Sequence, residues 1–573
     1  MAGLLARQFL KDEFGVWVPT EGKQQFGYSD GLWVEEYLER AMRSVSDLSS
    51  ESAELESYIR EWNTEYHLTR KRKDLLSGLD HNRTAKVLEI GCGCGAITRF
   101  LGETYDNVVA VEGSYNRAKL ARLRTSDLPN VEVYASPYQH IGLEGQFDVV
   151  FCIGVLEYAP TYVDAEDPFA HALESMKRML KPNGSLVIAI ENKFGLKYFA
   201  NSTEDHAGRF FEGIEGYPRE AHGFETFGRL ELQKILGRYW DKSTFYYPFP
   251  DYKLPTSLLS DECFAAIDAG ELIAGTKERD YARDRTPFFD TRLVWPEVTK
   301  NGLAPHLSNS FLVVAGTGSE MEPTMGDRLA VLFNRERKPA FSTRSDVVRS
   351  ADGIVVQKAV TGTRLMGAEC VSISPEATRW VNAPTLAYTL FRRAHHRHFS
   401  QADLGAILQP WWDWLQAQEI EGAAAGHVPG YLIDALWHNV SLMPDGKLSV
   451  FDQELVWFED LPMKDVFLRS AIQWVARYAK REMPLLGTTC AINAVRLMAA
   501  SLGLSISHAD VRRVLRREAK LQATLGTASA RSVYAQTALT LYVPFFPLLK
   551  RGLANLEYYR RRARNLSRRL LGR

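Results

Sequence analysis

Residues that could bind a cofactor are concentrated between Val87 and Phe100, in the stretch VLEIGCGCGAITRF. An apolar run leads at once into Gly91, Gly93 and Gly95, and a helical pattern follows. This order predicts a buried strand, then a tight turn whose backbone can approach a ligand closely, and then a helix. The sequence therefore predicts that a nucleotide-containing cofactor binds at this turn.

Two kinds of cofactor are bound by turns of this type. A dinucleotide fold uses Gly-x-Gly-x-x-Gly/Ala with pyrophosphate at the helix N-terminus, a spacing that Gly91, Gly93 and Ala96 nominally satisfy. Here, however, Glu89 stands two residues before the first glycine, and Gly95 completes Glu-x-Gly-x-Gly-x-Gly. This pattern resembles motif I of class I S-adenosylmethionine-dependent methyltransferases. In that family the glycines admit the methionine part of the cofactor and the acidic residue helps to hold its charged end. A glycine-rich turn without a ligand is the alternative.

The segments that follow agree with this resemblance. VVAVEGS is a second apolar strand ending at Glu112, whose carboxylate can accept hydrogen bonds from both ribose hydroxyls. FDVVFCIGVLEY is expected to be a buried fourth strand opening into a helix, with Gly154 and Leu156 near the cofactor. The third strand, VEVYAS, ends at Ala135 and Ser136, where many relatives carry an acidic residue. The contact to the adenine is therefore left open.

The elements that would position these residues form an α/β fold. From residue 86 to 192 five strands alternate with helices, which predicts a Rossmann-like parallel sheet with right-handed crossovers. DKSTFYYPFPDYKLP and SNSFLVVAGT supply a sixth and a seventh strand, the seventh antiparallel as in the family, to give a seven-stranded methyltransferase sheet. The predicted parts are an N-terminal helical cover, the methyltransferase domain with a helical insertion at about 256–306, an α+β accessory or kinase-like domain, and a basic amphipathic tail: 1–80, 81–317, 326–530 and 531–573.

Composition narrows the class of protein. The chain has 573 residues, of which 45% are hydrophobic and 24% charged, with a net charge of -1. That length predicts two or more domains, and the charge balance does not favour nucleic acid as a partner. The six cysteines are scattered, and no Cys/His cluster with ligand spacing occurs, so no metal is expected in the methyltransferase domain. The first residues lack a signal-peptide pattern, and no apolar stretch reaches the roughly 20 residues of a spanning helix, so we expect a cytoplasmic protein.

Several polar and aromatic residues are candidates for the acceptor side of the site. Tyr66 and His67, in helices that lead into the glycine turn, are expected to line the pocket, although plain packing is the alternative for each. The long segment IENKFGLKYFANSTEDHAGRFFEGIEGYP follows the fifth strand and fits a binding loop at the carboxyl end of a parallel sheet. His206 in this loop is the first candidate for a general base and Glu191 is the second. Hydrogen bonding within the loop is the alternative for His206.

The amino-acid sequences of several segments resemble those of a bacterial subgroup of methyltransferases that are encoded with surface-polysaccharide glycosyltransferases. These segments are YSDG, YHLT, IENKFGLKYFA, EDHAG, TFGR and PFPDYKLP. The resemblance implies O-methylation of a sugar in polysaccharide or lipopolysaccharide biosynthesis, with a glycan or lipid-linked saccharide as acceptor and a glycosyltransferase as a candidate partner. A catalytically idle scaffold for glycan-assembly enzymes is the competing hypothesis.

The second half carries another pattern. Asp434 and Asn439 are five residues apart, and Asp452 follows after a Pro-Asp-Gly hairpin. The spacing resembles the catalytic loop and metal-binding aspartate of protein-kinase-like and aminoglycoside-kinase-like phosphotransferases, and Lys358 in IVVQK resembles their nucleotide-binding lysine. The resemblance implies ATP and Mg²⁺ as ligands, as in bifunctional methyltransferase/kinases that cap an O-polysaccharide chain. No glycine-rich loop precedes Lys358, and Leu432 stands where a histidine is usual, so an accessory binding domain is the alternative.

The last stretch joins a short apolar run to an arginine-rich end with leucines and a pair of tyrosines, in YVPFFPLLKRGLANLEYYRRRARNLSRRLLGR. Basic residues beside aromatic and aliphatic ones are typical of an interfacial helix on an anionic leaflet, so a peripheral membrane contact on the inner face is one hypothesis. A solvated helix end or a contact with a glycosyltransferase is the alternative, and RNA binding is a further one.

Overall fold

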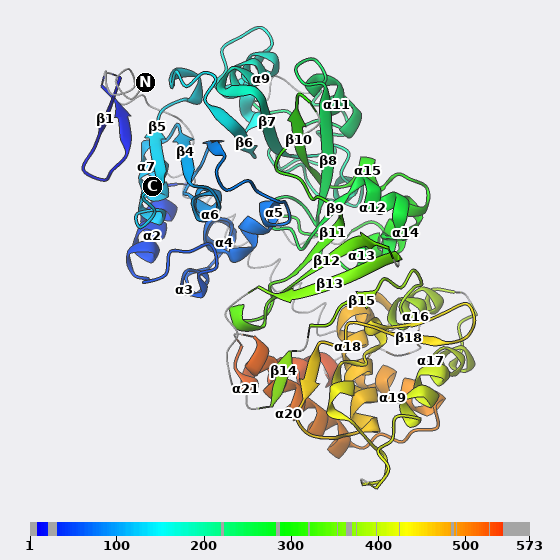
Figure 1. The fold of residues 1–573 in the computed structure, drawn as a ribbon. Helices are drawn as coiled ribbons and strands as arrows, with labels where there is room; N and C mark the ends of the chain where they lie inside the picture. Colours follow the sequence, from blue (N-terminus) through cyan, green and yellow to red (C-terminus); the bar gives the residue numbers. More distant parts are fainter. Residues whose placement is uncertain are drawn as a thin grey trace, which may run out of the picture. The chain divides into compact units, whose positions relative to one another are not determined.

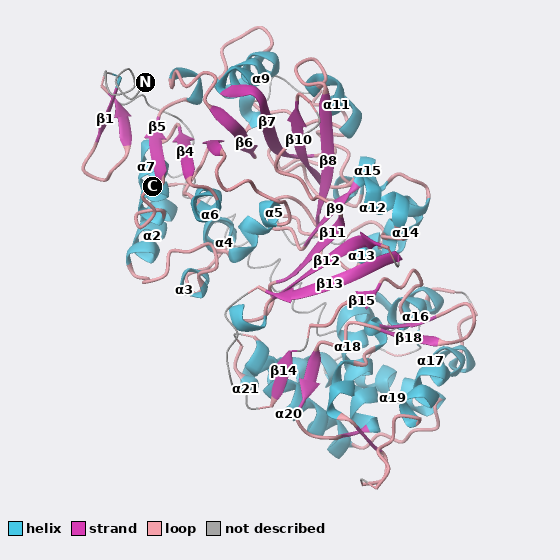
Figure 2. Ribbon diagram, in the orientation of Figure 1, coloured by secondary structure: helices cyan, strands magenta, loops and turns pink. Residues whose placement is uncertain are grey.

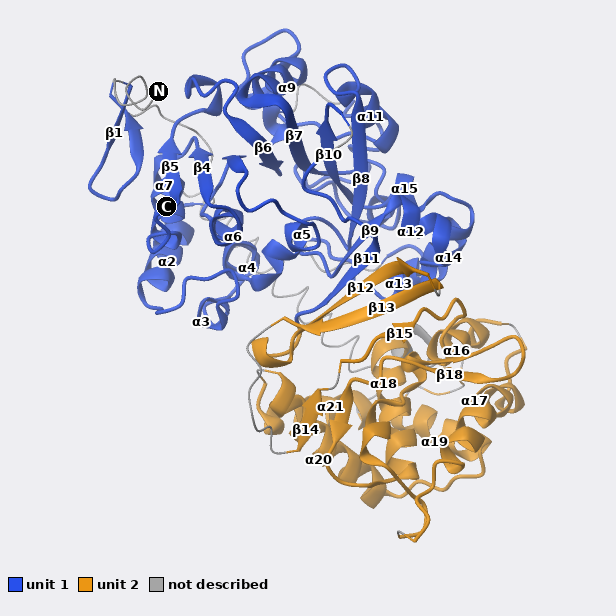
Figure 3. Ribbon diagram, in the orientation of Figure 1, with its two compact units in different colours: residues 1–335 blue, residues 336–573 orange. Residues whose placement is uncertain are grey.

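The protein is represented by a computed structural model that divides the chain into two compact units, residues 1–335 and 336–573 (Figure 3). The second unit thus begins after the predicted start at residue 326. The predicted tail is described only as far as residue 542, and the rest of it lies outside the described residues. The described residues are 8–20, 31–218, 223–281, 287–318, 321–351, 353–361, 370–373, 375–396, 398–422, 424–482, 486, 488, 490–526 and 528–542.

The first unit is built around a mixed sheet. Figure 1 labels most of its strands, and Figure 2 colours them by element type. Its strand order within this unit is β1-β2-β5-β4-β3-β6-β7-β10-β8-β9-β11. Strands β3 to β7 run parallel to their neighbours, whereas β10 is antiparallel to both β7 and β8. The strands span Phe9–Lys11 (β1), Trp17–Pro19 (β2), Lys86–Ile90 (β3), Asn107–Glu112 (β4), Val131–Ala135 (β5), Phe147–Ile153 (β6), Leu180–Glu191 (β7), Lys242–Phe249 (β8), Ser257–Ser260 (β9), Ser310–Gly316 (β10) and Arg328–Asn334 (β11).

The predicted Rossmann-like sheet is confirmed. The run β5-β4-β3-β6-β7-β10-β8 contains the seven predicted strands, and the seventh, β10, is antiparallel as expected.

The structure adds strands at both edges. The hairpin β1-β2 pairs with β5 through Trp17 and Tyr134, so the N-terminal region is not helical throughout. Strand β9 pairs with β8 and β11 at the start of the segment expected to be a helical insertion. Strands of three or four residues are too short to give an alternating pattern that sequence reasoning could find.

The central strands read as continuous apolar runs because both faces of a parallel sheet are covered. Val87, Val108, Val149, Val187 and Leu312, one from each of five strands, belong to one buried cluster. Helices of the unit close over the faces and over the cofactor turn. They span Leu32–Arg43 (α2), Ala53–Glu56 (α3), Trp62–Leu68 (α4), Asp74–Ser77 (α5), Ala96–Thr104 (α6), Tyr115–Arg124 (α7), Ala159–Tyr162 (α8), Pro168–Met179 (α9), Leu196–Phe199 (α10), Arg229–Leu236 (α11), Asp261–Ala266 (α12), Gly270–Ala274 (α13), Thr291–Lys300 (α14) and Ala304–Leu307 (α15), with 3₁₀ turns at Arg70–Lys73 (η1), Tyr138–His140 (η2) and Leu156–Tyr158 (η3).

The second unit combines short antiparallel strands with a helical majority. Strand β13 pairs with β12 and with β15, and three two-stranded ladders join β14 to β19, β16 to β20 and β17 to β18. The strands span Thr343–Ser350 (β12), Gly353–Val360 (β13), Val371–Ile373 (β14), Thr378–Arg379 (β15), His427–Val428 (β16), Val440–Leu442 (β17), Leu448–Val450 (β18), Leu455–Trp457 (β19) and Leu461–Pro462 (β20). The helices span Leu386–Ala394 (α16), Gln401–Gln416 (α17), Met463–Glu482 (α18), Ala491–Ser501 (α19), His508–Leu525 (α20) and Ala530–Tyr542 (α21), with 3₁₀ turns at Pro339–Phe341 (η4), Gly430–Asp434 (η5) and Trp437–Asn439 (η6).

None of the helices in the described part of the chain combines the length and the apolar character needed to cross a bilayer.

Candidate active site

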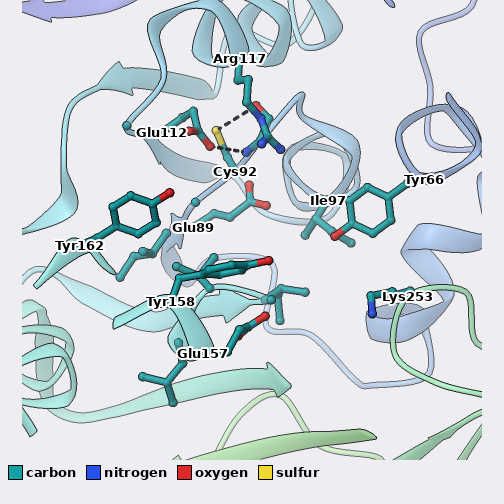
Figure 4. Close-up of a pocket in the computed structure, with 18 of the residues that line it drawn as sticks. Tyr66, Glu89, Cys92, Ile97, Glu112, Arg117, Glu157, Tyr158, Tyr162 and Lys253 are labelled. Carbon is teal, nitrogen blue, oxygen red and sulfur yellow. Dashed lines mark hydrogen bonds between the residues drawn. The ribbon is translucent and has the colours of Figure 1, made fainter. Parts of the chain in front are cut away.

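A cavity of about 320 Å³ opens in the first unit where β3, β4, β6 and β7 end, at the carboxyl edge of the parallel strands. Open α/β sheets bind ligands at this edge. In Figure 4, Glu112 and Arg117 lie at the top of the pocket, Glu157 at the bottom and Lys253 at the right. Most of the predicted site residues meet here: Tyr66, His67, Glu89, Gly91, Gly93, Glu112, Gly154, Leu156, Glu191 and His206 all line the cavity.

The glycine turn has a conformation that only glycine adopts readily. Gly91 and Gly93 have φ angles of 69° and 55°, in the left-handed region. A Cβ atom on Gly91 would lie 2.5 Å from a Val155 methyl group, and one on Gly93 would lie 2.8 Å from the Arg117 guanidinium. Side chains at these positions would fill the space between the turn and its neighbours, so the backbone itself forms this wall of the cavity.

Gly95 has a different role from the one predicted. It does not line the cavity, and a Cβ atom there would lie 2.7 Å from the Ala121 backbone in α7. The third glycine therefore allows α6 and α7 to pack closely behind the turn. Ser136, at the end of β5, does line the cavity and leaves no carboxylate at that strand end.

Two carboxylates flank the turn. Glu112 accepts hydrogen bonds from the backbone N–H groups of Gly93 at 2.8 Å and Ser114 at 2.9 Å, one on each oxygen. Each oxygen keeps a further lone pair for a ligand hydroxyl. Glu89 is 3% exposed, and its Oε2 atom has no hydrogen-bond partner among the described residues. Burial raises the pKa of Glu89 to about 7. A cationic ligand beside Glu89 would satisfy this oxygen, so the two carboxylates and the glycine wall together fit S-adenosylmethionine.

The acceptor side of the cavity is built from carboxylates, a histidine and a lysine. His206 Nδ1 lies 2.9 Å from Glu204 Oε1, and His206 Nε2 lies 3.8 Å from Glu191 Oε2 and 3.9 Å from Glu157 Oε1. The Lys253 ammonium contacts Glu191 and lies 2.5 Å from Asp205. His206 is also stacked on Phe224 at 5.2 Å between ring centroids. The ring is therefore held in place with Nε2 directed at two carboxylates.

These groups perturb one another strongly. Burial by itself would lower the pKa of His206, but Glu191, Glu157 and Glu204 outweigh it and raise that pKa well above 6.5. Burial raises the pKa of Glu157. Burial also acts to raise the pKa of Glu191, but Lys253 and His206 reverse this effect and lower it. An interacting cluster of this kind in a cleft is typical of a functional site.

Aromatic and basic residues that sequence reasoning did not select complete the walls. The Arg72 guanidinium lies 4.2 Å from the Tyr66 ring centroid and donates to the Tyr66 hydroxyl at 3.1 Å. Trp62 and Tyr281, far apart in sequence, pack with ring centroids 4.0 Å apart at the cavity. Lys253 lies in PFPDYKLP, a segment that carries the resemblance to the polysaccharide-associated subgroup, and this was the available signal for it. No comparable signal marked Trp62 or Tyr281.

In the second unit the structure brings the four predicted kinase-like residues together. The Lys358 ammonium contacts the Asp452 carboxylate and lies 2.8 Å from Glu454. The Asn439 amide donates to the backbone oxygens of Asp434 at 2.9 Å and Asp452 at 3.4 Å. The Asp434 carboxylate itself is buried and lies 3.7 Å from an Arg469 nitrogen.

Comparison with known proteins gives one family. The methyltransferase domain family matches residues 88–188. The ubiquinone biosynthesis O-methyltransferase of Psychrobacter arcticus is 30% identical over 189 residues, which cover 29% of this chain and 70% of that protein. The protein of that name from Pseudomonas aeruginosa strain UCBPP-PA14 is 29% identical over 182 residues, or 28% of this chain and 71% of that protein.

Solved methyltransferase structures also match. A possible histamine N-methyltransferase from Thermotoga maritima is 14% identical, with a TM-score of 0.26, and covers 43% of this chain and 87% of that chain. The N-methyltransferase NodS from Bradyrhizobium japonicum is 22% identical, with a TM-score of 0.20, and covers 22% of this chain and 67% of that chain. The strand order, the cofactor turn and the relatives that span this region lead to one conclusion. The chain belongs to the class I S-adenosylmethionine-dependent methyltransferases.

Proposed function

We propose that this methyltransferase transfers a methyl group to an oxygen atom of a saccharide during the assembly of a bacterial surface polysaccharide. One observation carries the proposal. Four of the six segments that resemble the polysaccharide-associated subgroup, YHLT, IENKFGLKYFA, EDHAG and PFPDYKLP, contribute residues to the same cavity as the cofactor turn. YHLT contributes Tyr66 and His67, EDHAG contributes Asp205 and His206, and PFPDYKLP contributes Tyr252 and Lys253. The O-methyltransferase names of the curated relatives favour an oxygen acceptor.

The cofactor end of the cavity has a separate role. S-adenosylmethionine bound there supplies an electrophilic methyl group on a sulfonium. The backbone at Gly91 and Gly93 admits the cofactor, Glu89 compensates its positive charge, and Glu112 accepts hydrogen bonds from its ribose. The protein then has to hold the acceptor oxygen in line and exclude water.

The acceptor end supplies the proton acceptor. A sugar hydroxyl has a high intrinsic pKa, so a positioned base contributes about 10²- to 10⁴-fold. His206 remains the first candidate and Glu191 the second, since both line the cavity and lie within 3.8 Å of each other. Because Glu191, Glu157 and Glu204 raise the pKa of His206, transfer of its proton to a neighbour such as Glu157 would prepare Nε2 to accept another.

The function is tested by methyl transfer from labelled S-adenosylmethionine. Purified protein is incubated with lipid-linked saccharides from a polysaccharide-producing lysate and, in parallel, with hydroxylated aromatic quinone precursors. We expect label in the saccharide fraction with wild type and none with Gly93→Asp. If only the aromatic acceptors are labelled, the substrate is not a saccharide but belongs to the class that the relatives' names indicate. Cofactor binding without transfer to any acceptor would favour the scaffold hypothesis.

This function implies a cytoplasmic reaction next to the membrane where lipid-linked saccharides are assembled. The basic end of the chain would then contact either an anionic leaflet or a glycosyltransferase. Flotation with anionic and neutral vesicles separates these choices, because only the first requires anionic lipid.

A second candidate function is phosphate transfer by the second unit, favoured by the contact between Lys358 and Asp452. Kinase-like enzymes use such a lysine and aspartate to hold ATP and Mg²⁺. Asp452 has a φ angle of 56° and a side chain that is 45% exposed, so a ligand can reach it. Glu454, bound to both Lys358 and Arg337, also compensates the lysine charge. The burial of Asp434 beside Arg469 argues against Asp434 as a base in this conformation.

Phosphate transfer is tested with labelled ATP, Mg²⁺ and the same saccharide fraction. Transfer is expected with wild type and with Gly93→Asp, but not with Asp452→Ala. If none of the proteins binds ATP in the presence of Mg²⁺, the second unit is an accessory domain.

A further inference from the structure

We propose that Glu157, Glu191 and His206 form a binding site for a divalent metal ion in the wall of the methyltransferase cavity. The three residues come from the turn after β6, the end of β7 and the loop that follows it. One potential ligand atom from each lies within 4.8 Å of the other two. Ligand atoms around a single ion are roughly 3 to 4.5 Å apart when the metal–ligand bonds are about 2.0–2.2 Å. Small side-chain adjustments would therefore bring all three atoms into the first coordination sphere of one ion.

The contacts within this group are incomplete as they stand. The separations of 3.8 and 3.9 Å from His206 Nε2 to the two carboxylates are too long for hydrogen bonds. Glu157 and Glu191 are each 1% exposed, and the Oε2 atom of each has no hydrogen-bond partner among the described residues. Buried carboxylate oxygens without a donor are costly. A cation between these three side chains would supply the missing partner of Glu191 Oε2, the atom that faces His206.

The surroundings of His206 fit a metal ligand. Metal-binding histidines commonly donate their other ring N–H to a carboxylate, which fixes the tautomer and the ring orientation. Here Glu204 Oε1 lies 2.9 Å from Nδ1, and Glu204 Oε2 accepts the backbone N–H of His206 at 2.8 Å. Tyr158 and Phe224 pack against the ring with centroids 5.3 and 5.2 Å away. This arrangement leaves Nε2 as the nitrogen that faces the two glutamates.

The local charge also calls for a cation. The directly connected groups are the carboxylates of Glu157, Glu191, Glu204 and Asp205 and the ammonium groups of Lys197 and Lys253. A charged His206 leaves these carboxylates in excess by one; a metal ion would displace the imidazole proton, and with the neutral imidazole the excess is two. A divalent ion balances this difference. Lys253 binds the Oε1 atom of Glu191, so Oε2 remains on the side that faces His206.

Two carboxylates and one imidazole favour Mn²⁺ or Zn²⁺ over Ca²⁺, because imidazole suits transition metals whereas Ca²⁺ prefers oxygen ligands only. All three ligands line the cavity, so an open coordination position would face the acceptor. If the proposed methyl transfer to oxygen is correct, an ion there would bind the acceptor hydroxyl and ease its deprotonation. With Nε2 bound to the ion, His206 would hold the metal and would not itself be the base. This role rests on the proposed function, whereas the metal site itself does not.

Metal binding is measured first, without substrate. Mn²⁺ is titrated into chelator-treated protein and followed by its electron paramagnetic resonance signal, with Zn²⁺ as competitor. We expect one saturable site per chain that Zn²⁺ displaces. Glu157→Gln and His206→Ala should each weaken Mn²⁺ binding at least tenfold, whereas Glu132→Gln, which removes the same charge from an exposed position on β5, should leave it unchanged. Circular dichroism and thermal melting show whether each variant is folded.

The outcomes are distinct. The metal site is overturned if neither ion binds saturably to wild type, or if folded Glu157→Gln binds Mn²⁺ as tightly as wild type. His206 is then only an ion-paired histidine. Metal binding without methyl transfer to oxygen acceptors keeps the site and removes the proposed function. Metal binding with transfer that a chelator stops and Mn²⁺ restores supports both.

Discussion

The Oε2 atom of Glu112 accepts the backbone N–H of Gly93 across 2.8 Å, so the end of β4 is tied directly to the glycine turn after β3 (Figure 4). The same carboxylate is the expected partner of the cofactor ribose. Glu112 fixes the turn and is expected to bind the ligand as well, so substitution of either residue should affect cofactor binding.

Substitution of Gly93 by Asp should abolish binding of S-adenosylmethionine. The new Cβ would lie 2.8 Å from Arg117, and the new carboxylate would stand beside Glu112. Isothermal titration should show no heat of binding, while circular dichroism remains that of wild type. Gly302→Asp is the matched control, because Gly302 also has a positive φ of 70° but has nothing within 4 Å of the added Cβ. Equal loss of binding in both variants would point to general backbone strain instead of the pocket.

The affinity for S-adenosylmethionine should rise with pH up to about 7. Glu89 has a pKa of about 7 in the cofactor-free protein because it is buried. A cationic ligand favours the ionised carboxylate, so the complex holds fewer protons than the free protein, and raising the pH favours the complex. The gain is at most about tenfold per pH unit, and it ends above the pKa of Glu89.

Titrations at about pH 5.5, 6.2 and 7 in buffers of different ionisation enthalpy measure both the affinity and the proton release. Glu89→Gln should bind weakly and lose the dependence on pH in this range. A wild-type affinity that is constant across the range would show that Glu89 is already ionised in the free protein.

Replacement of His206 by Ala should lower methyl-transfer turnover at least tenfold and leave cofactor affinity nearly unchanged. His206 faces Glu157 and Glu191 at the acceptor end of the cavity. Turnover under saturating acceptor and a separate cofactor titration provide the two measurements. His171→Ala, at an exposed histidine of α9, serves as the control. Unchanged turnover in His206→Ala would remove its role as base and as metal ligand in the reaction.

Removal of the Arg335 side chain should destabilise the first unit by about 3–5 kcal/mol, the usual cost of leaving one partner of a buried ion pair uncompensated. Arg335 is 6% exposed and donates to both oxygens of Asp74, which is fully buried. Urea unfolding of Arg335→Met, followed by a probe in the first unit, measures the loss. Arg83→Met breaks the exposed pair with Asp106 and should change stability by less than about 1 kcal/mol. Similar effects of the two substitutions would contradict the importance of burial.

Local sequence patterns predicted the core of the fold and most of the residues around the glycine turn that line the cavity. The glycine turn, the carboxylate at the end of β4 and the alternation of strands and helices are set by contiguous residues, because a parallel strand and the turn after it are specified by their own apolar run and glycines. Very short strands such as β1, β2 and β9 were missed because pairing with a neighbouring strand, and not their own pattern, makes them strands.

Only the tertiary structure decided the acceptor half of the site. The sequence indicated His206 and Glu191 as candidate bases but gave no sign that they lie beside Glu157. It predicted no metal site because it contains no Cys/His cluster with the spacing of metal ligands. Their ligand atoms meet because β6 and β7 are adjacent parallel strands that end at one edge, and because the loop after β7 folds back so that Lys253 and Glu204 can hold it there. The distances along the chain between these residues follow no repeat, so the sequence gives no sign that they lie close together. The packing of the loop against the sheet brings them together.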